Sequence, residues 1–250
     1  MLSHTLSEVI EGNLSVNSEI GIILPTYCEA ANIGNLICEI ENLGLNVSIL
    51  VIDDSSPDRT ADIVRSFQKK YDNILLFVRP EKLGLGTAIT DGFKIFLSLK
   101  NPPRCVVTMD ADYSHNPKEI FNLLAISKDA DLAIGSRYHR GSAIVNWSFF
   151  RLLTSKIANL VASLIIRAGI NDYTSGMRCY SADLLRCIIN DIHSRTYEIQ
   201  LETIRQASLR KFKIKETPIT FVNRKIGKSK LTFNEIKDFL SYVVNIYRKR

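Results

Sequence analysis

The chain has 250 residues, of which 46% are hydrophobic and 23% charged, an ordinary composition for a soluble globular protein. Its 32 lysines and arginines outnumber its 26 acidic residues, and the resulting formal charge of +6 favours anionic partners. Few aromatic residues accompany the basic clusters near the C-terminus. We therefore expect no nucleic-acid partner, because single strands are bound largely by stacking on aromatic rings.

The cysteines indicate a reducing compartment, and the apolar runs indicate neither a signal peptide nor a membrane span. The five cysteines are odd in number and include no CxxC pair, which is typical of reduced thiols in the cytoplasm. The first residues lack the basic and apolar regions of a signal peptide, so we expect none. The longest continuous apolar run, IANLVASLII, is well short of a bilayer span, so we also expect no membrane-spanning segment.

In the first half of the chain, apolar β-rich runs alternate with helical patterns. This alternation predicts an α/β fold with a Rossmann-like, mainly parallel sheet and helices on both faces. The second helix is expected to start at Ser56 as the N-cap and Pro57 as the first helical residue. The expected strands are residues 20–26, 47–53, 74–79, 105–111 and 131–137, and the expected helices are 30–42, 57–71, 86–99 and 117–127.

The second half begins with a helix and ends with an amphipathic one. We expect, in order, a helix at 149–167, a loop at 168–180, a helix at 197–211, a strand at 213–222 and a C-terminal amphipathic helix with a basic tip. No repeat or Pro/Gly-rich linker divides the chain. The expected organisation is an N-terminal tail over 1–19, one domain over 20–231 and the C-terminal helix over 232–250.

Polar and charged residues follow four of the expected strands, in the segments PTYCE, DDSSPD, DADYSH and GSRY. In open α/β sheets, ligands bind beyond the carboxyl ends of the strands. These segments therefore define the candidate site.

Asp110 and Asp112 stand one residue apart at the end of the fourth expected strand. In extended backbone such residues project to the same face. Two hard oxygen ligands suit Mg²⁺ or Mn²⁺, which complete their shells with water and substrate phosphates. An acidic turn that caps the next helix is the alternative interpretation.

Other motifs have more than one interpretation. Asp53 and Asp54 suit a turn, or a carboxylate that accepts hydrogen bonds from a ribose or a base edge. The segment EKLGLGTAITDG lacks the ending of a phosphate-binding P-loop and indicates a tight turn into a helix. The basic segment NRKIGKSK, with Arg224 and Lys230, follows a strand without helical periodicity, which suits a lid over phosphates.

Taken together, eight segments resemble a known family. They are ILPTYCEAANI, VIDDSSPDRT, EKLGLGTAITDGF, MDADYSHNP, IGSRY, DYTSGMRCY, YEIQLE and PITFVNRKIGKSKL. In this order they resemble the dolichyl-phosphate mannosyltransferases, within the inverting nucleotide-sugar glycosyltransferases of GT-A fold. The resemblance covers about residues 20–235.

The resemblance implies a role for each matching residue. It implies a nucleotide pocket lined by Pro25, Tyr27 and Glu29, base and ribose contacts from Val51 and Asp53, metal and diphosphate contacts from Asp110, Ala111 and Asp112, and phosphate contacts from Arg137, Arg224 and Lys230. Asp112 and Arg137 are the expected catalytic residues, and Asp110 and Asp112 the expected ligands of Mg²⁺ or Mn²⁺.

The implied reaction is inverting transfer of mannose from GDP-mannose to dolichyl or polyprenyl monophosphate, giving a lipid-phosphate sugar donor for glycosylation. One alternative is another hexosyltransferase that uses a UDP-sugar with the same acceptor. A second is transfer to a hydroxyl group with Asp172 as the base. A third, of another class, is a non-catalytic nucleotide-sugar-binding or scaffold protein.

Because the isoprenoid tail of such an acceptor stays in the bilayer, we expect a cytoplasmic protein peripheral to the cytoplasmic face of the plasma membrane or endoplasmic reticulum. Trp147, Phe150, Arg151 and Lys156 combine aromatic and basic character, as in helices that lie at a membrane surface. The later apolar positions of this helix equally suit packing on the core. A small membrane-embedded subunit is a further candidate partner.

Overall fold

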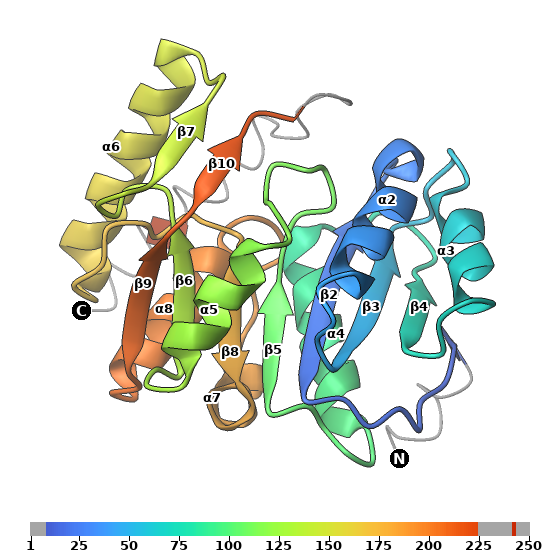
Figure 1. Cartoon of the computed structure of the whole chain (residues 1–250). Coiled ribbons are helices and arrows are strands. Elements are labelled where there is room, and N and C mark those ends of the chain that lie inside the picture. The colour runs from blue at the N-terminus through green and yellow to red at the C-terminus, as the bar shows by residue number, and fades with distance from the viewer. Residues whose placement is uncertain (1–8, 225–241, 244–250) are drawn as a thin grey trace.

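The computed structural model describes residues 9–224 and 242–243 (Figure 1). Within these residues, eight strands form one mixed sheet in the spatial order β1-β4-β3-β2-β5-β8-β6-β9, and β7 and β10 form a small parallel sheet beside it. The large sheet consists of β1 Ile10–Glu11, β2 Ile20–Thr26, β3 Val47–Asp53, β4 Ile74–Val78, β5 Cys105–Thr108, β6 Leu132–Ser136, β8 Arg178–Ser181 and β9 Ile214–Pro218. The small sheet consists of β7 Ala143–Val145 and β10 Thr220–Val222.

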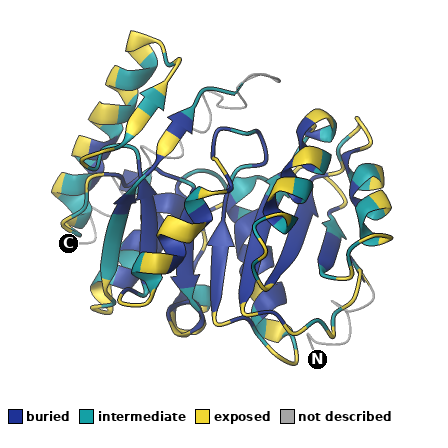
Figure 2. Ribbon diagram, in the orientation of Figure 1, coloured by how far each residue is buried: buried dark blue, intermediate teal, exposed yellow. Residues whose placement is uncertain are grey.

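Helices cover both faces of the large sheet. They are α2 Ala30–Glu41, α3 Thr60–Gln68, α4 Leu85–Ser98, α5 Glu119–Ser127, α6 Phe149–Ile166, α7 Ala182–Ile188 and α8 Ile199–Leu209, with a short 3₁₀ turn at Ile189–Asp191. Ile23 of β2 packs in a cluster with α4, α7 and α8, whereas its neighbours Ile22 and Leu24 pack in a second cluster with α2 and α5. The sheet is accordingly buried between the layers (Figure 2). The predicted α/β fold is confirmed.

The central strands formed where the sequence predicts them. β2 and β3 have the expected bounds, and Ile22 pairs in parallel register with Ile49 of β3 and Val107 of β5. Strands buried on both faces have continuous apolar sequences rather than alternating ones. This is why the sequence located them closely.

The expected loop over 168–180 is wrong at its C-terminal end. Residues Arg178–Ser181 form β8, which lies antiparallel between β5 and β6 in the middle of the sheet. Its first residue is a fully buried arginine whose guanidinium binds the backbone oxygens of Tyr173, Ser175 and Gln200. With a charged residue among only four, β8 lacks the apolar run by which a buried strand is predicted from sequence. The following helix α7 was not predicted either.

Two further boundaries differ from expectation. The expected strand over 213–222 is two strands, because β9 ends at Pro218 and β10 leaves the large sheet to pair with β7. The second helix begins at Thr60 rather than at Pro57. Ser56 does not cap it: its backbone N–H and hydroxyl group donate to Asp53, at 2.8 and 2.6 Å.

Described residues lie on both sides of the expected domain. Within the segment expected to be a tail, Ile10–Glu11 pairs with β4, so the sheet begins before residue 20. The expected C-terminal helix lies outside the described residues except for Tyr242 and Val243. These two are helical and pack against the core cluster that contains α7 and α8.

Helix α6 corrects the expectation that no segment is long enough to span a membrane. By length and composition alone, its 18 residues with a mean hydropathy of 1.5 qualify, and only 11% of them are buried within the described residues. A single helix of this kind is weak evidence for a membrane span, because core helices pass the same test.

Candidate active site

A cleft opens at the carboxyl ends of β2 and β5 and at the N-terminus of α4. It is lined by Pro25, Thr26, Tyr27, Glu29, Asp54, Lys82, Gly84, Leu85, Ala88, Asp110, Ala111, Asp112, Tyr197 and Arg224. The structure therefore brings together seven of the residues proposed from the sequence, namely Pro25, Tyr27, Glu29, Asp110, Ala111, Asp112 and Arg224. Lys230 lies outside the described residues.

Asp110 and Asp112 lie in a loop that follows β5, not at the end of an extended strand as expected. The loop is held by its own polar groups. The backbone N–H of Asp110 donates to Nδ1 of His115 at 3.1 Å, and that of Ser114 donates to Oδ1 of Asp112 at 3.0 Å. His115 is 1% exposed, so this contact fixes the loop from inside the protein. Both carboxylates remain at the cleft.

The two carboxylates differ in their electrostatic surroundings. Burial raises the pKa of Asp110, and the negative charge of Asp112 raises it further. For Asp112, burial alone would raise the pKa, but hydrogen bonds from Ser114 and the charge of Arg224 lower it overall. Nη2 of Arg224 lies 3.2 Å from Oδ2 of Asp112, and both side chains are largely buried. A cationic group thus already occupies one side of the pair.

The donor set fits a divalent cation. Across the described ranges, no group of three or more His, Cys, Asp or Glu side chains is placed to hold a metal ion. A cation held by Asp110 and Asp112 would therefore take most of its ligands from water and from a bound diphosphate, as Mg²⁺ and Mn²⁺ commonly do. The crowding of two carboxylates, one of them bound to a guanidinium, indicates a site for positive charge.

One wall of the cleft presents an aromatic ring and polar groups suited to a nucleoside. Nζ of Lys82 lies 4.5 Å from the centre of the Tyr27 ring. Glu29 is buried at the start of α2, where Oε2 accepts a hydrogen bond from Asn32 at 2.8 Å. Aromatic faces and fixed carboxylates of this kind are common in pockets for small polar ligands.

Two residues expected at the nucleotide, Val51 and Asp53, do not line the cleft within the described residues. Val51 is in the middle of β3 and fully buried in the core. Asp53 is 1% exposed, and its oxygens accept hydrogen bonds from Thr26 and Ser56. Asp53 therefore shapes the loop after β3, while its neighbour Asp54 reaches the cleft.

Asp54 belongs to a buried ion pair that the sequence did not reveal. It pairs with Arg79, which is 1% exposed and also donates to the hydroxyl of Thr87 at 2.7 Å and to the backbone oxygen of Gly84 at 2.9 Å. Burial raises the pKa of Asp54, although the charge of Arg79 opposes that effect. The pair ties the ends of β3 and β4 to the N-terminus of α4, which forms the floor of the cleft.

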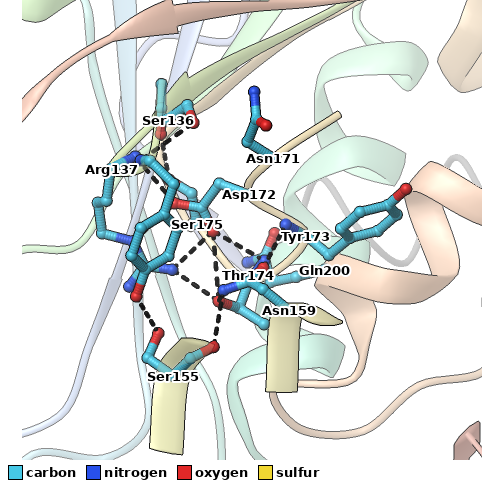
Figure 3. A network of polar contacts seen from close by, with 12 residues as sticks. Ser136, Arg137, Ser155, Asn159, Asn171, Asp172, Tyr173, Thr174, Ser175 and Gln200 are labelled. Atoms are coloured by element: carbon cyan, nitrogen blue, oxygen red, sulfur yellow. Dashed lines mark hydrogen bonds and ion pairs between the residues drawn. The ribbon is translucent and has the colours of Figure 1, made fainter. Parts of the chain in front are cut away.

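Arg137 is engaged by Asp172 rather than exposed to the cleft (Figure 3). Its Nε and Nη2 donate to the two oxygens of Asp172 at 2.8 and 2.7 Å, and its backbone N–H donates to Oδ2 at 2.9 Å. Asp172 is 0% exposed. Burial alone would raise its pKa, but the charge and hydrogen bonds of Arg137 lower it. So enclosed a carboxylate is poorly placed to act as a base toward a hydroxyl acceptor.

From the sequence, Arg151, at the start of α6, is expected only in a membrane-surface helix. It does not line the cleft, but its charge lies near that of Arg224, which does. Its guanidinium lies 4.3 Å from the centre of the Trp147 ring, and Nη1 donates to Oδ1 of Asn223 at 2.7 Å. Burial lowers its pKa, and the nearby charges of Arg224 and Arg137 lower it further. The sequence does show a basic residue at the start of an apolar helix. Its contacts with Trp147 and Asn223 are known only from the structure.

The small sheet connects these two groups of charges. β10 pairs with β7, forms an isolated bridge from Phe221 to His115, and donates from the Val222 backbone to Ser114 at 3.1 Å. The Phe221 ring meets those of His115 and Trp147 edge-on, with centres 5.2 and 5.3 Å apart. Phe221 therefore links the loop that carries Asp110 and Asp112 to Trp147, the ring on which the Arg151 guanidinium lies.

Comparisons with known proteins agree with this arrangement. Residues 21–189 match the family model described as glycosyl transferase family 2. The chain is 36% identical over 220 residues to the polyprenol monophosphomannose synthase of Mycolicibacterium smegmatis, covering 87% of this chain and 82% of that protein. It is also 36% identical over 228 residues to the undecaprenyl-phosphate mannosyltransferase of Micrococcus luteus, covering 90% and 91%.

Solved structures show the same fold. Glucosyl-3-phosphoglycerate synthase from Mycobacterium tuberculosis, in complex with Mn²⁺, UDP and glucosyl-3-phosphoglycerate, superposes with a TM-score of 0.64 at 16% identity, covering 94% of this chain and 80% of that one. Mannosyl-3-phosphoglycerate synthase from Rubrobacter xylanophilus gives 0.57 at 15% identity, covering 93% and 74%. The GT-A-like fold implied by the resemblance is confirmed.

Proposed function

Because this chain belongs to glycosyl transferase family 2 and is a glycosyltransferase, we propose that it transfers mannose from GDP-mannose to a polyprenyl or dolichyl monophosphate, with inversion at the anomeric carbon. The names of the two relatives at 36% identity support mannose and a polyprenyl phosphate as the substrates. The observation that carries the proposal is that Arg151 lies near both Arg224 and Asp112, because two neighbouring arginines suit an anionic acceptor.

The acceptor chemistry agrees with the site. A phosphate monoester has a second pKa near ~6 and is largely dianionic at neutral pH, so it needs little help from a general base. An acceptor oxygen forms a bond to the anomeric carbon while the bond to the diphosphate breaks, and GDP leaves. Attack opposite the leaving group inverts that carbon. Asp172, buried against Arg137, is not required as a base in this reaction.

On the donor side, we assign Asp110, Ala111 and Asp112 to the diphosphate and the divalent cation, and Pro25, Tyr27, Glu29 and Lys82 to the nucleoside. Bound Mg²⁺ or Mn²⁺ would supply positive charge to the leaving diphosphate. The fixed loop between Asp110 and His115 keeps the carboxylates in position before substrate binds.

On the acceptor side, we assign Arg151 to the phosphate, with Lys230 as a further candidate. Arg224, beside Asp112, is placed to contact both the donor diphosphate and the acceptor phosphate. Arg137 has a supporting role: its guanidinium lies 5.5 Å from the centres of both the Trp147 and Phe221 rings, and Trp147 in turn supports Arg151. It is a positioning residue in this scheme. We propose that residues 20–231 form the catalytic domain, together with β1 at its N-terminal side.

We further propose that the enzyme works at the cytoplasmic face of a membrane. Phe149 and Phe150 are 73% and 78% exposed at the start of α6, two residues or fewer from Arg151. A lipid phosphate held by Arg151 would then have its isoprenoid tail next to exposed apolar side chains. A small membrane-embedded subunit that contacts the same surface would serve the same purpose.

Transfer assays with purified protein, Mn²⁺ and polyprenyl phosphate test the reaction. GDP-mannose with a labelled mannosyl group should yield a labelled lipid, and mild acid should release the label from that lipid. NMR of the lipid product should show an anomeric configuration opposite to that of the donor. Arg151→Gln should raise the acceptor KM by about 10-fold or more, because a charged hydrogen bond to phosphate is lost. Arg140→Gln, at an exposed arginine, is the matched control.

The outcomes separate the alternatives. Transfer from UDP-glucose but not from GDP-mannose would replace the donor and keep the reaction. Binding of nucleotide sugars without transfer to any acceptor would support the non-catalytic alternative. An unchanged acceptor KM in Arg151→Gln would show that the phosphate binds elsewhere.

A further inference from the structure

Gln200, in the first turn of α8, has a polar group that the protein itself does not satisfy. The residue is 3% exposed, and its side-chain oxygen Oε1 has no hydrogen-bond partner within the described part of the chain. Burying an amide oxygen without a donor is unfavourable, and such groups are rare in folded proteins. Its segment, YEIQLE, is one of the eight that carry the family resemblance, which implies no role for Gln200.

The backbone around Gln200 is firmly fixed. Its carbonyl oxygen accepts a hydrogen bond from Nη1 of Arg178 at 2.7 Å, and Nη1 also donates to the Thr203 hydroxyl at 3.0 Å. Arg178 is 0% exposed and binds two further backbone oxygens, and Figure 3 includes Gln200 among the residues of the adjoining polar network. The backbone that carries the amide is thus held in place, and the side chain, at 3% exposed, is not a surface group in contact with bulk water.

Gln200 lies near Asp110 across a glycine. A Cβ atom on Gly176 would be 3.3 Å from Oδ1 of Asp110 and 3.7 Å from Nε2 of Gln200. The carbonyl oxygen of Gly176 is itself fixed by the hydroxyl of Thr108, at 2.9 Å. The carboxylate and the amide therefore border the same small space, which the absence of a side chain at residue 176 leaves open.

This space adjoins the cleft through Asp110, although Gly176 and Gln200 do not themselves line the cleft. Asp110 lines the cleft, and so does Tyr197, three residues before Gln200. The donor sugar has to lie between the diphosphate, assigned to Asp110 and Asp112, and the acceptor phosphate, assigned to Arg151. We propose that Gln200 accepts a hydrogen bond from a hydroxyl group of the donor sugar, and that Gly176, which has no side chain, leaves that hydroxyl group a path to the amide. The inference rests on the proposed function.

A polar site of this kind would select among sugars. A buried group that needs a hydrogen bond discriminates strongly against a ligand that lacks the matching hydroxyl, since the group is then left unpaired. Gln200 would accordingly be a specificity-determining residue, distinct from the groups that hold the phosphates.

The test is a cycle that combines Gln200→Leu with donors lacking one hydroxyl each. GDP-mannose and its 2-, 3-, 4- and 6-deoxy analogues are compared by kcat/KM with wild-type and variant enzyme. We expect the variant to lose about 10- to 100-fold with the full donor and less than about 3-fold with one deoxy analogue. The affinity for GDP with Mn²⁺ should stay within about 2-fold, because Gln200 would contact only the sugar.

Controls distinguish this role from a structural one. Gln206→Leu, on the same helix, should leave the discrimination among deoxy donors unchanged. Equal losses of Gln200→Leu with all donors, or a matching loss of GDP affinity, would mean that Gln200 only positions Asp110, and would overturn the proposal. If the wild type uses another sugar nucleotide, the same cycle applies to the deoxy forms of that sugar, so an error in the donor does not affect the result.

Discussion

Asp112 contacts Arg224 and is also an assigned ligand of the divalent cation, so the two positive charges should compete for its carboxylate. The contact between Arg224 and Asp112 at 3.2 Å places a guanidinium where a divalent cation would bind. We expect Arg224→Gln to bind Mn²⁺ alone about 3- to 10-fold more tightly than the wild type, since a partly buried pair contributes on the order of 1 kcal/mol. With GDP present the order should reverse, because the freed Arg224 can contact the diphosphate.

Calorimetric titration of Mn²⁺ with and without GDP measures both effects. Arg140→Gln changes the net charge equally at an exposed position and should alter neither affinity by more than about 2-fold. Equal or weaker binding of Mn²⁺ alone by Arg224→Gln would show that the two cations do not compete for Asp112.

The Arg137–Asp172 pair should contribute strongly to stability. Asp172→Asn leaves a buried guanidinium without its counter-charge, and we expect a loss of about 3–5 kcal/mol in the free energy of unfolding at pH 7. The pKa of Asp172 is lowered in the folded protein, so its contribution is present above the unfolded value of about 3.9 and lost as the pH falls through the folded value. The gap between wild type and variant should therefore narrow below about pH 4.

Urea denaturation at pH 7 and at several values below pH 4 gives this comparison. Asp183→Asn removes an exposed partner of Arg186, whose pair is 84% exposed on the aspartate side, and should change stability by less than about 0.5 kcal/mol. A gap between wild type and Asp172→Asn that stays constant down to the acid transition would contradict the pKa argument.

Some site residues were predictable from the sequence because their identity and local position suffice. Asp110 and Asp112 follow a buried strand, and the carboxyl end of that strand lies at the cleft. The interaction of Arg137 was not predictable, since its partner Asp172 is 35 residues away. Gln200 belonged to a noticed segment, but its significance depends on Gly176 and Asp110, which only the folded sheet brings near it.

Among the elements, α4 has a glycine in its first turn, Gly86, because the backbone of residues 194–196 packs closely against it. A Cβ atom there would lie 2.5 Å from the backbone oxygen of Ser194 and 2.8 Å from that of Thr196. Alanine usually stabilises a helix relative to glycine by about 0.5–1 kcal/mol. Here we expect Gly86→Ala to destabilise by about 1–3 kcal/mol, because backbone atoms cannot move aside as side chains can.

Thermal unfolding should show this as a decrease of about 2–4 °C in Tm for each kcal/mol lost. Gly34→Ala is the matched control: it is also helical, and its Cβ would meet the Phe67 ring at 3.0 Å, a side chain that can shift. A Tm of Gly86→Ala at or above that of the wild type would show that α4 is not packed tightly on residues 194–196.

The elements that the sequence located well share one physical feature. β2, β3 and the helix α2 between them are built from long apolar patterns whose period depends on local residues alone. β8 is short and begins with a buried arginine, and β10 is separated from β9 only by Ile219 after Pro218. These strands form because of partners far along the chain, so local patterns could not indicate them.

Across the whole molecule, the donor and acceptor sides are linked by one small sheet. β10 contacts the loop that carries Asp112, and β7 leads into α6, which carries Arg151. The exposed face of α6 therefore lies next to the assigned phosphate site and not on a remote surface. A membrane-surface enzyme needs this continuity, because its lipid substrate has one end in the bilayer and the other at the reacting centre.

Exposed apolar side chains recur along one stripe of α6, at Phe149, Leu153, Ile157, Leu160 and Leu164, with Phe150 beside it. Their spacing of three or four residues keeps them on one side of the helix. A stripe of this kind near Arg151 and Lys156 is typical of helices that bind lipid headgroups and the upper acyl chains. We expect wild-type protein to float with vesicles containing anionic phospholipid, and less with neutral ones or at high salt.

Substitutions in α6 should weaken this binding through lost apolar contact. Each Phe→Ser change should lower the partition coefficient by roughly 10-fold, because inserting a phenylalanine side chain contributes about 1.5–3 kcal/mol when fully buried. Phe149→Ser with Phe150→Ser should therefore leave nearly all protein unbound and reduce transfer to long-chain lipid, while transfer to a short, water-soluble polyprenyl phosphate is kept. Phe121→Ser, at a 46% exposed position on α5, is the matched control. If wild type and double variant float equally, or neither floats, α6 is not the surface that contacts lipid.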